Sequence, residues 1–315
     1  MARSFIPIIP VRLTAGEQYT WGDINVRPFG VPVNATGVVL HLFCTGGAKD
    51  YGLRRNGNTD ARNGSSNSGN WHTWAVVGID GAGIFEFYNV GVAPRVVIDL
   101  IGYTVEGVNF DLAAVTAPNI SPAAAAWNVV DLSTFGVPAT AIGVIIEVYA
   151  LISNTFGYRQ NGSGDARTFN VSSEHSTFSF VVGCDANQII ELFRGAANVN
   201  FYLHGYITDG ATFYLNAPDI TPGVAGAWED LLILPLTGIM PFIEVSGVGG
   251  QFGACNNVAD GPADYRVNGQ HSFAMPEALD RNCLGRAQAG TNFHLVGYSR
   301  FSIAEVQTNP ATEIT

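Results

Sequence analysis

The sequence has few charged residues. Only 13% of its 315 residues are Asp, Glu, Lys or Arg, about half the share of roughly 25% in a typical soluble domain. Hydrophobic residues make up 47% of the chain. Disordered chains combine low hydrophobicity with high charge, so this composition excludes a largely disordered protein and predicts packed cores.

Basic residues are the scarcer of the charged types. Lys and Arg number 15 against 26 Asp and Glu, which gives a formal net charge of −11. Proteins that bind nucleic acid need Lys and Arg to replace the counterions of the phosphates, and anionic membranes attract basic segments. We therefore expect no nucleic-acid partner and no membrane partner.

Two targeting patterns are also missing. The longest uncharged, apolar stretch runs from Leu112 to Val130, but it contains Pro118 and Pro122 and predicts a linker rather than a membrane helix. The N-terminal residues lead directly into Phe5-Ile-Pro-Ile-Ile-Pro10, without the apolar helical core of a secretory signal. We therefore expect synthesis in a cytosol.

Cysteines and catalytic motifs are scarce as well. Cys44, Cys184, Cys255 and Cys283 are too few and too scattered to staple a chain of this length. In a cytosol we expect free thiols, with a Cys255–Cys283 disulfide as the alternative. The six histidines lack metal-ligand spacing, and no nucleophile, zinc-protease or phosphate-loop motif occurs. The sequence predicts no metal, no cofactor and no enzyme.

What the sequence does contain is one unit in three copies. Phe29-Gly-Val-Pro32 recurs as Phe135-Gly-Val-Pro138, and each copy has a tryptophan near its start and a Gly-Tyr pair at its end. The tryptophans are Trp21, Trp127 and Trp228, and the tyrosines are Tyr103, Tyr206 and Tyr298. We place the units at residues 1–105, 106–208 and 209–300, followed by a polar tail at 301–315. Each unit has roughly 100 residues, the usual size of one domain.

Each unit carries the signals of short strands. The expected strands are Gly37–Phe43, Thr73–Ile79, Ile84–Tyr88 and Val96–Tyr103 in the first unit, and Ile142–Ile152, Thr177–Gly183, Ile189–Phe193 and Val199–Ile207 in the second. No segment sustains the apolar period of a helix. The sequence therefore predicts an all-β protein of three tandem β-sandwich repeats, either jelly-roll-like or immunoglobulin-like in topology.

One polar motif recurs without gaps in the first two units. Its members are Arg54, Asn56, Asp60, Arg62 and a following His72 in the first, and Arg159, Asn161, Asp165, Arg167 and His175 in the second. One interpretation is a structural network: the Asn-Gly steps form tight turns, and Asp pairs with the Arg two residues away on the same strand face. The histidine would then cap that network.

Two functional interpretations compete with the structural one. Arg, Asn and Asp side chains beside an aromatic ring suit sugar hydroxyls, so the two full copies would form weak, multivalent glycan sites. A calcium site at Asp60 or Asp165 is the other alternative, although no D-x-D-x-D-G loop supplies the roughly six to eight oxygens that it needs.

Two glutamates occupy matched positions in the second and third units. They are Glu147 and Glu244, and the first unit has His41 there. Glycosidases need two carboxylates within about 5–10 Å of each other, whereas matched positions in separate units lie far apart. We therefore predict that both glutamates face solvent from the outer side of a strand.

Several short motifs carry a family resemblance. They are Pro10-Val-Arg-Leu13, Gly30-Val-Pro32, Phe87-Tyr-Asn89 and Val97–Tyr103 in the first unit, and Gly136-Val-Pro138 and Leu203–Tyr206 in the second. The pattern resembles a repeat of secreted, chiefly actinobacterial, surface proteins that begins P-x-R-L and ends V-D-V-x-G-Y-F. Thr14-Ala-Gly16 departs from that family, which has a D-T-R step at this place.

The chain also resembles the tandem β-sandwich structural proteins of tailed bacteriophages, which are Gly-rich, low in Lys and wholly β. This resemblance implies a non-enzymatic component of a virion, made in the host cytoplasm, that decorates the capsid or belongs to the tail. Its implied partners are other virion proteins or further copies of itself, and three similar units in one chain would mimic a trimer. A carbohydrate-binding adhesin on a cell surface, with a host glycan as partner, is the alternative, and a polysaccharide hydrolase is the third hypothesis.

Overall fold

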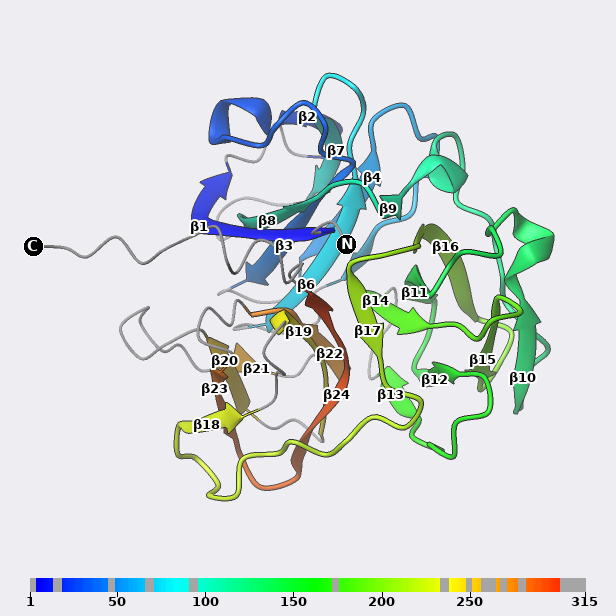
Figure 1. The fold of residues 1–315 in the computed structure, drawn as a ribbon, viewed down its shortest axis with the longest axis vertical. Helices are drawn as coiled ribbons and strands as arrows, with labels where there is room; N and C mark the ends of the chain where they lie inside the picture. Colours follow the sequence, from blue (N-terminus) through cyan, green and yellow to red (C-terminus); the bar gives the residue numbers. More distant parts are fainter. Residues whose placement is uncertain are drawn as a thin grey trace, which may run out of the picture.

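The computed structural model describes residues 4–13, 19–44, 49–65, 71–90, 96–171, 176–232, 238–247, 251–255, 265–266, 271–276 and 282–300 (Figure 1). These residues form 24 strands and three short 3-10 helices, η1 (Arg27–Phe29), η2 (Asp111–Ala113) and η3 (Leu132–Phe135). None of the helices within these ranges is long and apolar enough to cross a membrane.

The first eight strands form two facing layers, which we call unit 1. They are β1 (Phe5–Leu13), β2 (Trp21–Asn25), β3 (Gly37–Cys44), β4 (Asp50–Arg55), β5 (Gly64–Ser65), β6 (Trp71–Gly78), β7 (Ile84–Asn89) and β8 (Val97–Thr104). The hydrogen-bonded orders are β1-β8-β3-β6 in one layer and β2-β7-β4-β5 in the other. Successive strands alternate between the layers until β4, which gives the interleaved order of a jelly roll.

Strands β9–β16 repeat this arrangement as unit 2. They are β9 (Val108–Asn109), β10 (Ala126–Asp131), β11 (Gly143–Ala150), β12 (Asn154–Gln160), β13 (Phe169–Val171), β14 (Ser176–Gly183), β15 (Ile189–Arg194) and β16 (Val199–Ile207). The orders β9-β16-β11-β14 and β10-β15-β12-β13 match those of unit 1 strand for strand. Because β10 begins at Ala126, the interpretation of Leu112–Val130 as a linker is wrong for its last residues.

Strands β17–β24 repeat the arrangement a third time as unit 3. They are β17 (Ala211–Phe213), β18 (Glu229–Leu232), β19 (Gly238–Gly247), β20 (Gln251–Cys255), β21 (Tyr265–Arg266), β22 (His271–Ala274), β23 (Asn282–Ala287) and β24 (Thr291–Arg300). Their orders are β17-β24-β19-β22 and β18-β23-β20-β21. The all-β sandwich prediction is confirmed, and the strand order selects the jelly roll over the immunoglobulin-like alternative.

A tryptophan packed on a glycine recurs in every unit. The pairs are Trp21 with Gly52, Trp127 with Gly157, and Trp228 with Gly253. Each glycine lies in the fourth strand of its unit, and each tryptophan lies in the second strand or, for Trp228, directly before it. A Cβ at these glycines would lie 2.6, 2.8 and 2.3 Å from the indole carbons. Because only glycine leaves room for the ring, this contact explains why both residue types repeat along the chain.

The three jelly rolls close into a ring around their sixth strands. The fifth strand of unit 1 pairs in parallel with the sixth of unit 2 through Ser65 and Ser176, and the fifth of unit 3 pairs with the sixth of unit 1 through Arg266 and Trp71. Strand β13 of unit 2 contacts β22 of unit 3, and β6, β14 and β22 contact one another at the centre (Figure 1). Each unit therefore contacts the next head to tail, and the order closes after three.

Two hydrophobic clusters follow from this arrangement. Val38, Leu40 and Leu42 of β3 belong to a core inside unit 1. Val39 and Trp74 point the other way, into a second cluster that joins unit 1 to the cores of units 2 and 3. Strand β6 is buried at every position because both of its faces are covered, and such strands lose the alternation of apolar and polar residues.

Candidate functional site

In units 1 and 2 the polar motif begins at Arg54 and Arg159 in the fourth strand and continues through the loop before the fifth strand. Gly57 and Gly162 have φ values of +85° and +79°, a left-handed conformation that glycine adopts without strain. Asp60 and Arg62 form an ion pair of 3.0 Å. They lie in this loop rather than on one face of a strand, which corrects that detail of the sequence prediction.

One half of the motif holds the loop against its own unit. In unit 1, Arg54 forms an ion pair with Glu86 on β7 and donates a hydrogen bond to the backbone oxygen of Asp60. Its guanidinium lies 4.1 Å from the centre of the Trp21 ring. Asn56 donates to Asp80 at 2.7 Å. These contacts satisfy Arg54 and Asn56 within unit 1.

Unit 2 repeats each of these contacts. Arg159 donates to Glu191 at 2.6 Å and to the backbone oxygen of Asp165, and its guanidinium lies 4.2 Å from the Trp127 ring. Asn161 donates to Asp185 at 2.7 Å. The matched geometry shows that the repeated sequence encodes the same set of contacts within each of the two units.

The other half of the motif crosses to the next unit. Arg62 donates to Glu147 on β11 of unit 2 at 3.3 Å, and its guanidinium lies 3.5 Å from the centre of the Tyr202 ring. Asp60 accepts a hydrogen bond of 2.8 Å from the backbone N–H of Ala117 in unit 2. We call this set of contacts the clasp.

A second clasp joins units 2 and 3. Arg167 pairs with Asp165 at 3.0 Å and donates to Glu244 on β19 at 2.9 Å. Asp165 accepts a hydrogen bond of 2.9 Å from the backbone N–H of Ala217. The prediction that Glu147 and Glu244 face solvent is wrong: their side chains are 15% and 1% exposed because the neighbouring unit covers that face.

The two clasp glutamates differ in their surroundings. Glu147 accepts a hydrogen bond from Thr177 at 2.9 Å and lies 2.7 Å from His204. Burial raises the pKa of Glu147, but Arg62, His204 and Thr177 together lower it to about 2. His204 reaches this carboxylate because it is the extra residue of a β-bulge between β11 and β16.

Val296 occupies the matching bulge of β24 in unit 3 and offers no donor to Glu244. His294 is the nearest imidazole, at 4.0 Å. Burial therefore raises the pKa of Glu244 to about 7, although Arg167 and Tyr158 lower it in part. One clasp holds a firmly ionised carboxylate, and the other holds a carboxylate that titrates near neutral pH.

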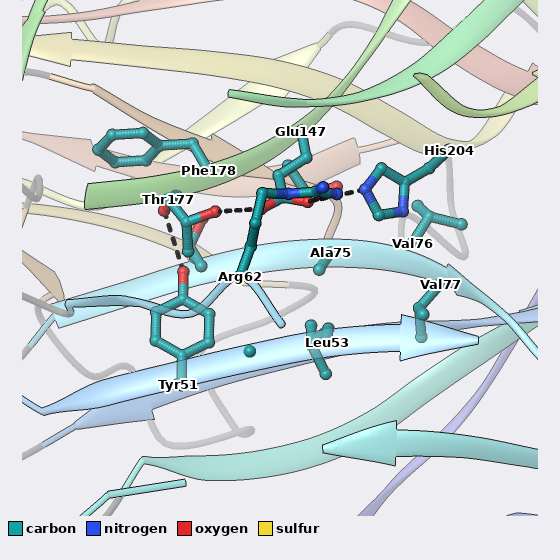
Figure 2. A pocket seen from close by; sticks show the side chains of 13 residues that line it. Tyr51, Leu53, Arg62, Ala75, Val76, Val77, Glu147, Thr177, Phe178 and His204 are labelled. Atoms are coloured by element: carbon teal, nitrogen blue, oxygen red, sulfur yellow. Dashed lines mark hydrogen bonds and ion pairs between the residues drawn. The ribbon is translucent and has the colours of Figure 1, made fainter. Parts of the chain in front are cut away.

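A small cavity lies beside the first clasp, between units 1 and 2. Figure 2 shows Thr177 and His204 on either side of Glu147, with Arg62 above Tyr51, whose hydroxyl donates to the Thr177 carbonyl at 3.0 Å. The cavity has a volume of about 30 Å³. That is room for a water molecule.

His72, the predicted histidine of unit 1, contacts another histidine of that unit. The Nδ1 of His72 is 2.8 Å from the Nε2 of His41, on the neighbouring strand of the same unit. The strand register matches His72 with Thr177 in unit 2 and with His271 in unit 3. His175 lies outside the described residues. The capping of the Arg-Asp network by His72 stays a prediction, and its described partner is His41.

The described residues contain no group of three or more His, Cys, Asp or Glu that would hold a metal ion. Cys283 is buried on β23. The side chain of Cys255 lies outside the described ones, so the Cys255–Cys283 pairing stays a prediction.

Sequence reasoning missed the partners of the motif. Glu86 and Glu191 have the same spacing along the chain as Arg54 and Arg159, so the repeat itself contained a signal for these pairs. The contact of Arg62 with Glu147 had no local signal, because it joins residues of two units.

No family model matches the chain, and no curated protein matches its sequence. The resemblances to actinobacterial surface repeats and to tailed-phage β-sandwich proteins therefore gain no support from sequence comparison.

Three solved structures with some likeness to the chain come from viruses. A chain of Sulfolobus turreted icosahedral virus is 12% identical over 86% of this chain and 82% of its own, with a TM-score of 0.20. A chain from an archaeal virus described by its triple jelly roll fold and turret assembly is 10% identical over 94% and 90%, with a TM-score of 0.23. A chain of the lipid-containing bacteriophage PM2 is 10% identical over 95% and 89%, with a TM-score of 0.16. TM-scores this low do not establish a common fold.

Proposed function

We propose that the protein is a non-enzymatic structural component of a virion, and that its three jelly rolls occupy a position of threefold symmetry in the shell. The observation that carries this proposal is the closed ring: three units of one topology contact each other head to tail around β6, β14 and β22. Jelly rolls build viral capsid and lectin domains. A ring of three in one chain offers neighbours three similar faces, as a trimer does.

The division of the chain belongs to the same proposal. We assign residues 1–105, 106–208 and 209–300 to the three units. Residues 301–315 are assigned to a polar C-terminal segment, which lies outside the described part of the chain. Within a virion we favour an exposed capsid position over a tail position, because icosahedral shells repeat threefold environments many times. Other virion proteins and further copies of the chain are the proposed partners.

The state of the polar motif supports a structural role over binding or catalysis. Arg54, Arg62, Arg159 and Arg167 each form an ion pair with a carboxylate of the protein. The contacts within each unit and the clasps occupy these guanidinium groups, apart from the Nε of Arg62, which is buried without a hydrogen-bond partner among the described residues. A glycan-binding adhesin is the alternative hypothesis for these residues, and no contact in the described residues favours it.

The test is quantitative proteomics on density-purified virus particles, compared with the soluble and secreted fractions of the same culture. We expect enrichment in the particles at many copies per particle, and a three-lobed density on threefold positions of the particle by electron cryo-microscopy. A few copies per particle would refute the capsid position in favour of the tail. Presence in the secreted fraction alone would refute the virion proposal and favour the adhesin.

A further inference from the structure

The cavity beside the first clasp lies where the two layers of unit 1 meet unit 2. Residues of β4 and β6 line it from unit 1, and residues of β11, β14 and β16 line it from unit 2. Figure 2 shows the Arg62 side chain reaching from unit 1 toward Glu147 and His204 of unit 2. The volume of about 30 Å³ exceeds the roughly 10–15 Å³ that one water molecule needs.

Two of the residues that line this cavity each have a buried polar atom without a hydrogen-bond partner among the described residues. These atoms are the Nε of Arg62 and the Oγ1 of Thr73. Thr73 is only 1% exposed. The two terminal nitrogens of the Arg62 guanidinium pair with Asp60 and Glu147, so Nε is the nitrogen that still needs an acceptor. Buried polar groups are nearly always hydrogen-bonded to protein or to ordered water.

The equivalent positions at the boundary between units 2 and 3 are occupied differently. Arg167 takes the place of Arg62, and its Nε donates a hydrogen bond to Glu244 at 2.9 Å. The strand register places Phe178, which has no polar side-chain atom, where unit 1 has Thr73. The unpaired guanidinium nitrogen and the hydroxyl therefore occur together in one clasp and are both absent from these positions in the other. That pattern is expected if the two atoms serve one site.

The groups around the cavity define the chemistry of its occupant. The Nε of Arg62 can only donate, so the occupant must accept a hydrogen bond. The carboxylate of Glu147 belongs to a residue of the same lining, and its negative charge repels an anion. The positive charge of Arg62 repels a cation. A small neutral molecule that both accepts and donates hydrogen bonds meets these demands, and water is the one that fits the volume.

We propose that this cavity is a binding site for buried water, and that the water is part of the first clasp. The water accepts a hydrogen bond from the Nε of Arg62 and forms another with the hydroxyl of Thr73. It thereby joins the loop that carries the Asp-Arg pair to β6, at the place where both meet unit 2. The proposal rests on the cavity and on the two unpaired atoms, and it holds whether or not the ring belongs to a virion.

Thr73→Val tests this proposal, because the presence and the absence of water predict opposite signs. With water in the cavity, the substitution removes a hydrogen bond and lowers stability. Without water, the hydroxyl is a buried group that nothing satisfies, so replacing it with a methyl group raises stability. We expect the urea midpoint of the full chain to fall in Thr73→Val, with the slope of the transition unchanged. A midpoint that rises or stays the same would overturn the proposal.

Thr291→Val is the matched control. Thr291 of β24 is 2% exposed, and its Oγ1 also has no hydrogen-bond partner among the described residues, but Thr291 does not line this cavity. We therefore expect the urea midpoint to rise in Thr291→Val. A fall of the same size in both variants would overturn the inference from Thr73, because the loss of a threonine hydroxyl would then lower stability without a water site beside it.

A crystal structure of the full chain, at a resolution that shows ordered water, gives the direct observation. We expect density in the cavity within hydrogen-bond distance of the Nε of Arg62 and the Oγ1 of Thr73. A cavity without density would overturn the proposal. A peak that acquires an anomalous signal when bromide replaces chloride in the crystal would also overturn it, because that signal identifies an anion in place of water.

Discussion

Glu147 and Glu244 occupy equivalent positions in the two clasps, but their pKa values are shifted in opposite directions. This difference predicts different pH dependences of stability for the two sites. The pKa of Glu244 is raised from 4.5 to about 7 in the folded protein, so the folded state binds the proton more tightly than the unfolded chain. Its contribution to stability is complete below about pH 4.5 and is lost as the pH rises through about 7. A shift of this size corresponds to about 3 kcal/mol.

The prediction concerns the pH dependence of Glu244→Gln. Glutamine does not titrate, so the variant lacks the loss of stability that the wild type undergoes between about pH 4.5 and 7. Relative to the wild type, the free energy of unfolding of Glu244→Gln should therefore improve by about 2.5 kcal/mol between pH 5 and pH 8, because part of the effect lies below pH 5. Arg167 keeps a partner in the variant, because Asp165 lies 3.0 Å away.

Glu147→Gln is the matched control. The pKa of Glu147 is lowered to about 2, so its contribution is present above pH 4.5 and is lost only as the pH falls toward 2. Between pH 5 and 8 the titration of Glu147 itself therefore adds no pH dependence to the cost of Glu147→Gln, which is about 3–5 kcal/mol for removing one partner of a buried pair. Urea unfolding at four pH values measures both differences. A cost of Glu244→Gln that does not change between pH 5 and 8 would refute the reasoning.

The close contact of Gly183 with Phe213 and the clasps lead to two further predictions. Gly183→Ala brings a methyl group within 2.5 Å of Phe213 of unit 3 and should cost about 1–3 kcal/mol by overpacking. The control Gly81→Ala meets no atom within 4 Å and should leave the melting temperature unchanged. Equal effects of the two variants in calorimetry would contradict the contact between Gly183 and Phe213. Combining Asp60→Ala with Asp165→Ala removes a charged hydrogen bond from each clasp and should cost about 1–3 kcal/mol per site. A glycan array should detect no binding by the wild type. If the wild type binds glycan, and the double variant loses that binding with its stability unchanged, the adhesin is favoured.

Much of the fold was predictable because its signals are local. Half of the sixteen strands of units 1 and 2 were expected within a few residues of their bounds, since short runs of Val, Ile and aromatics end at Gly, Asn or Pro. They are β3, β6, β7 and β8 and their counterparts β11, β14, β15 and β16. The Asn-Gly turns were also predictable, because the left-handed conformation of Gly57 and Gly162 depends on the residue itself. Because the motif aligns without gaps between units 1 and 2, the repeat also predicts equivalent surroundings for Arg54 and Arg159.

The candidate site was predictable only in its residues, and not in its geometry. Arg62 and Asp60 were singled out, but their partners Glu147 and Ala117 belong to another unit. A strand residue on the outer face of a sandwich is exposed in an isolated unit and buried in a ring, so no local pattern distinguishes the two cases. This is why Glu147 and Glu244 were expected at the surface.

The sequence by itself determined the all-β class, the three repeats and most turns, because alternation, turn residues and internal similarity are properties of short segments. Only the tertiary structure decided the jelly-roll order and the closure of the ring. Strand pairing and ring closure join residues far apart in the chain, such as Ser65 with Ser176 and Arg266 with Trp71. Whether a strand face is exposed to solvent or buried depends on which neighbouring unit those long-range contacts bring against it.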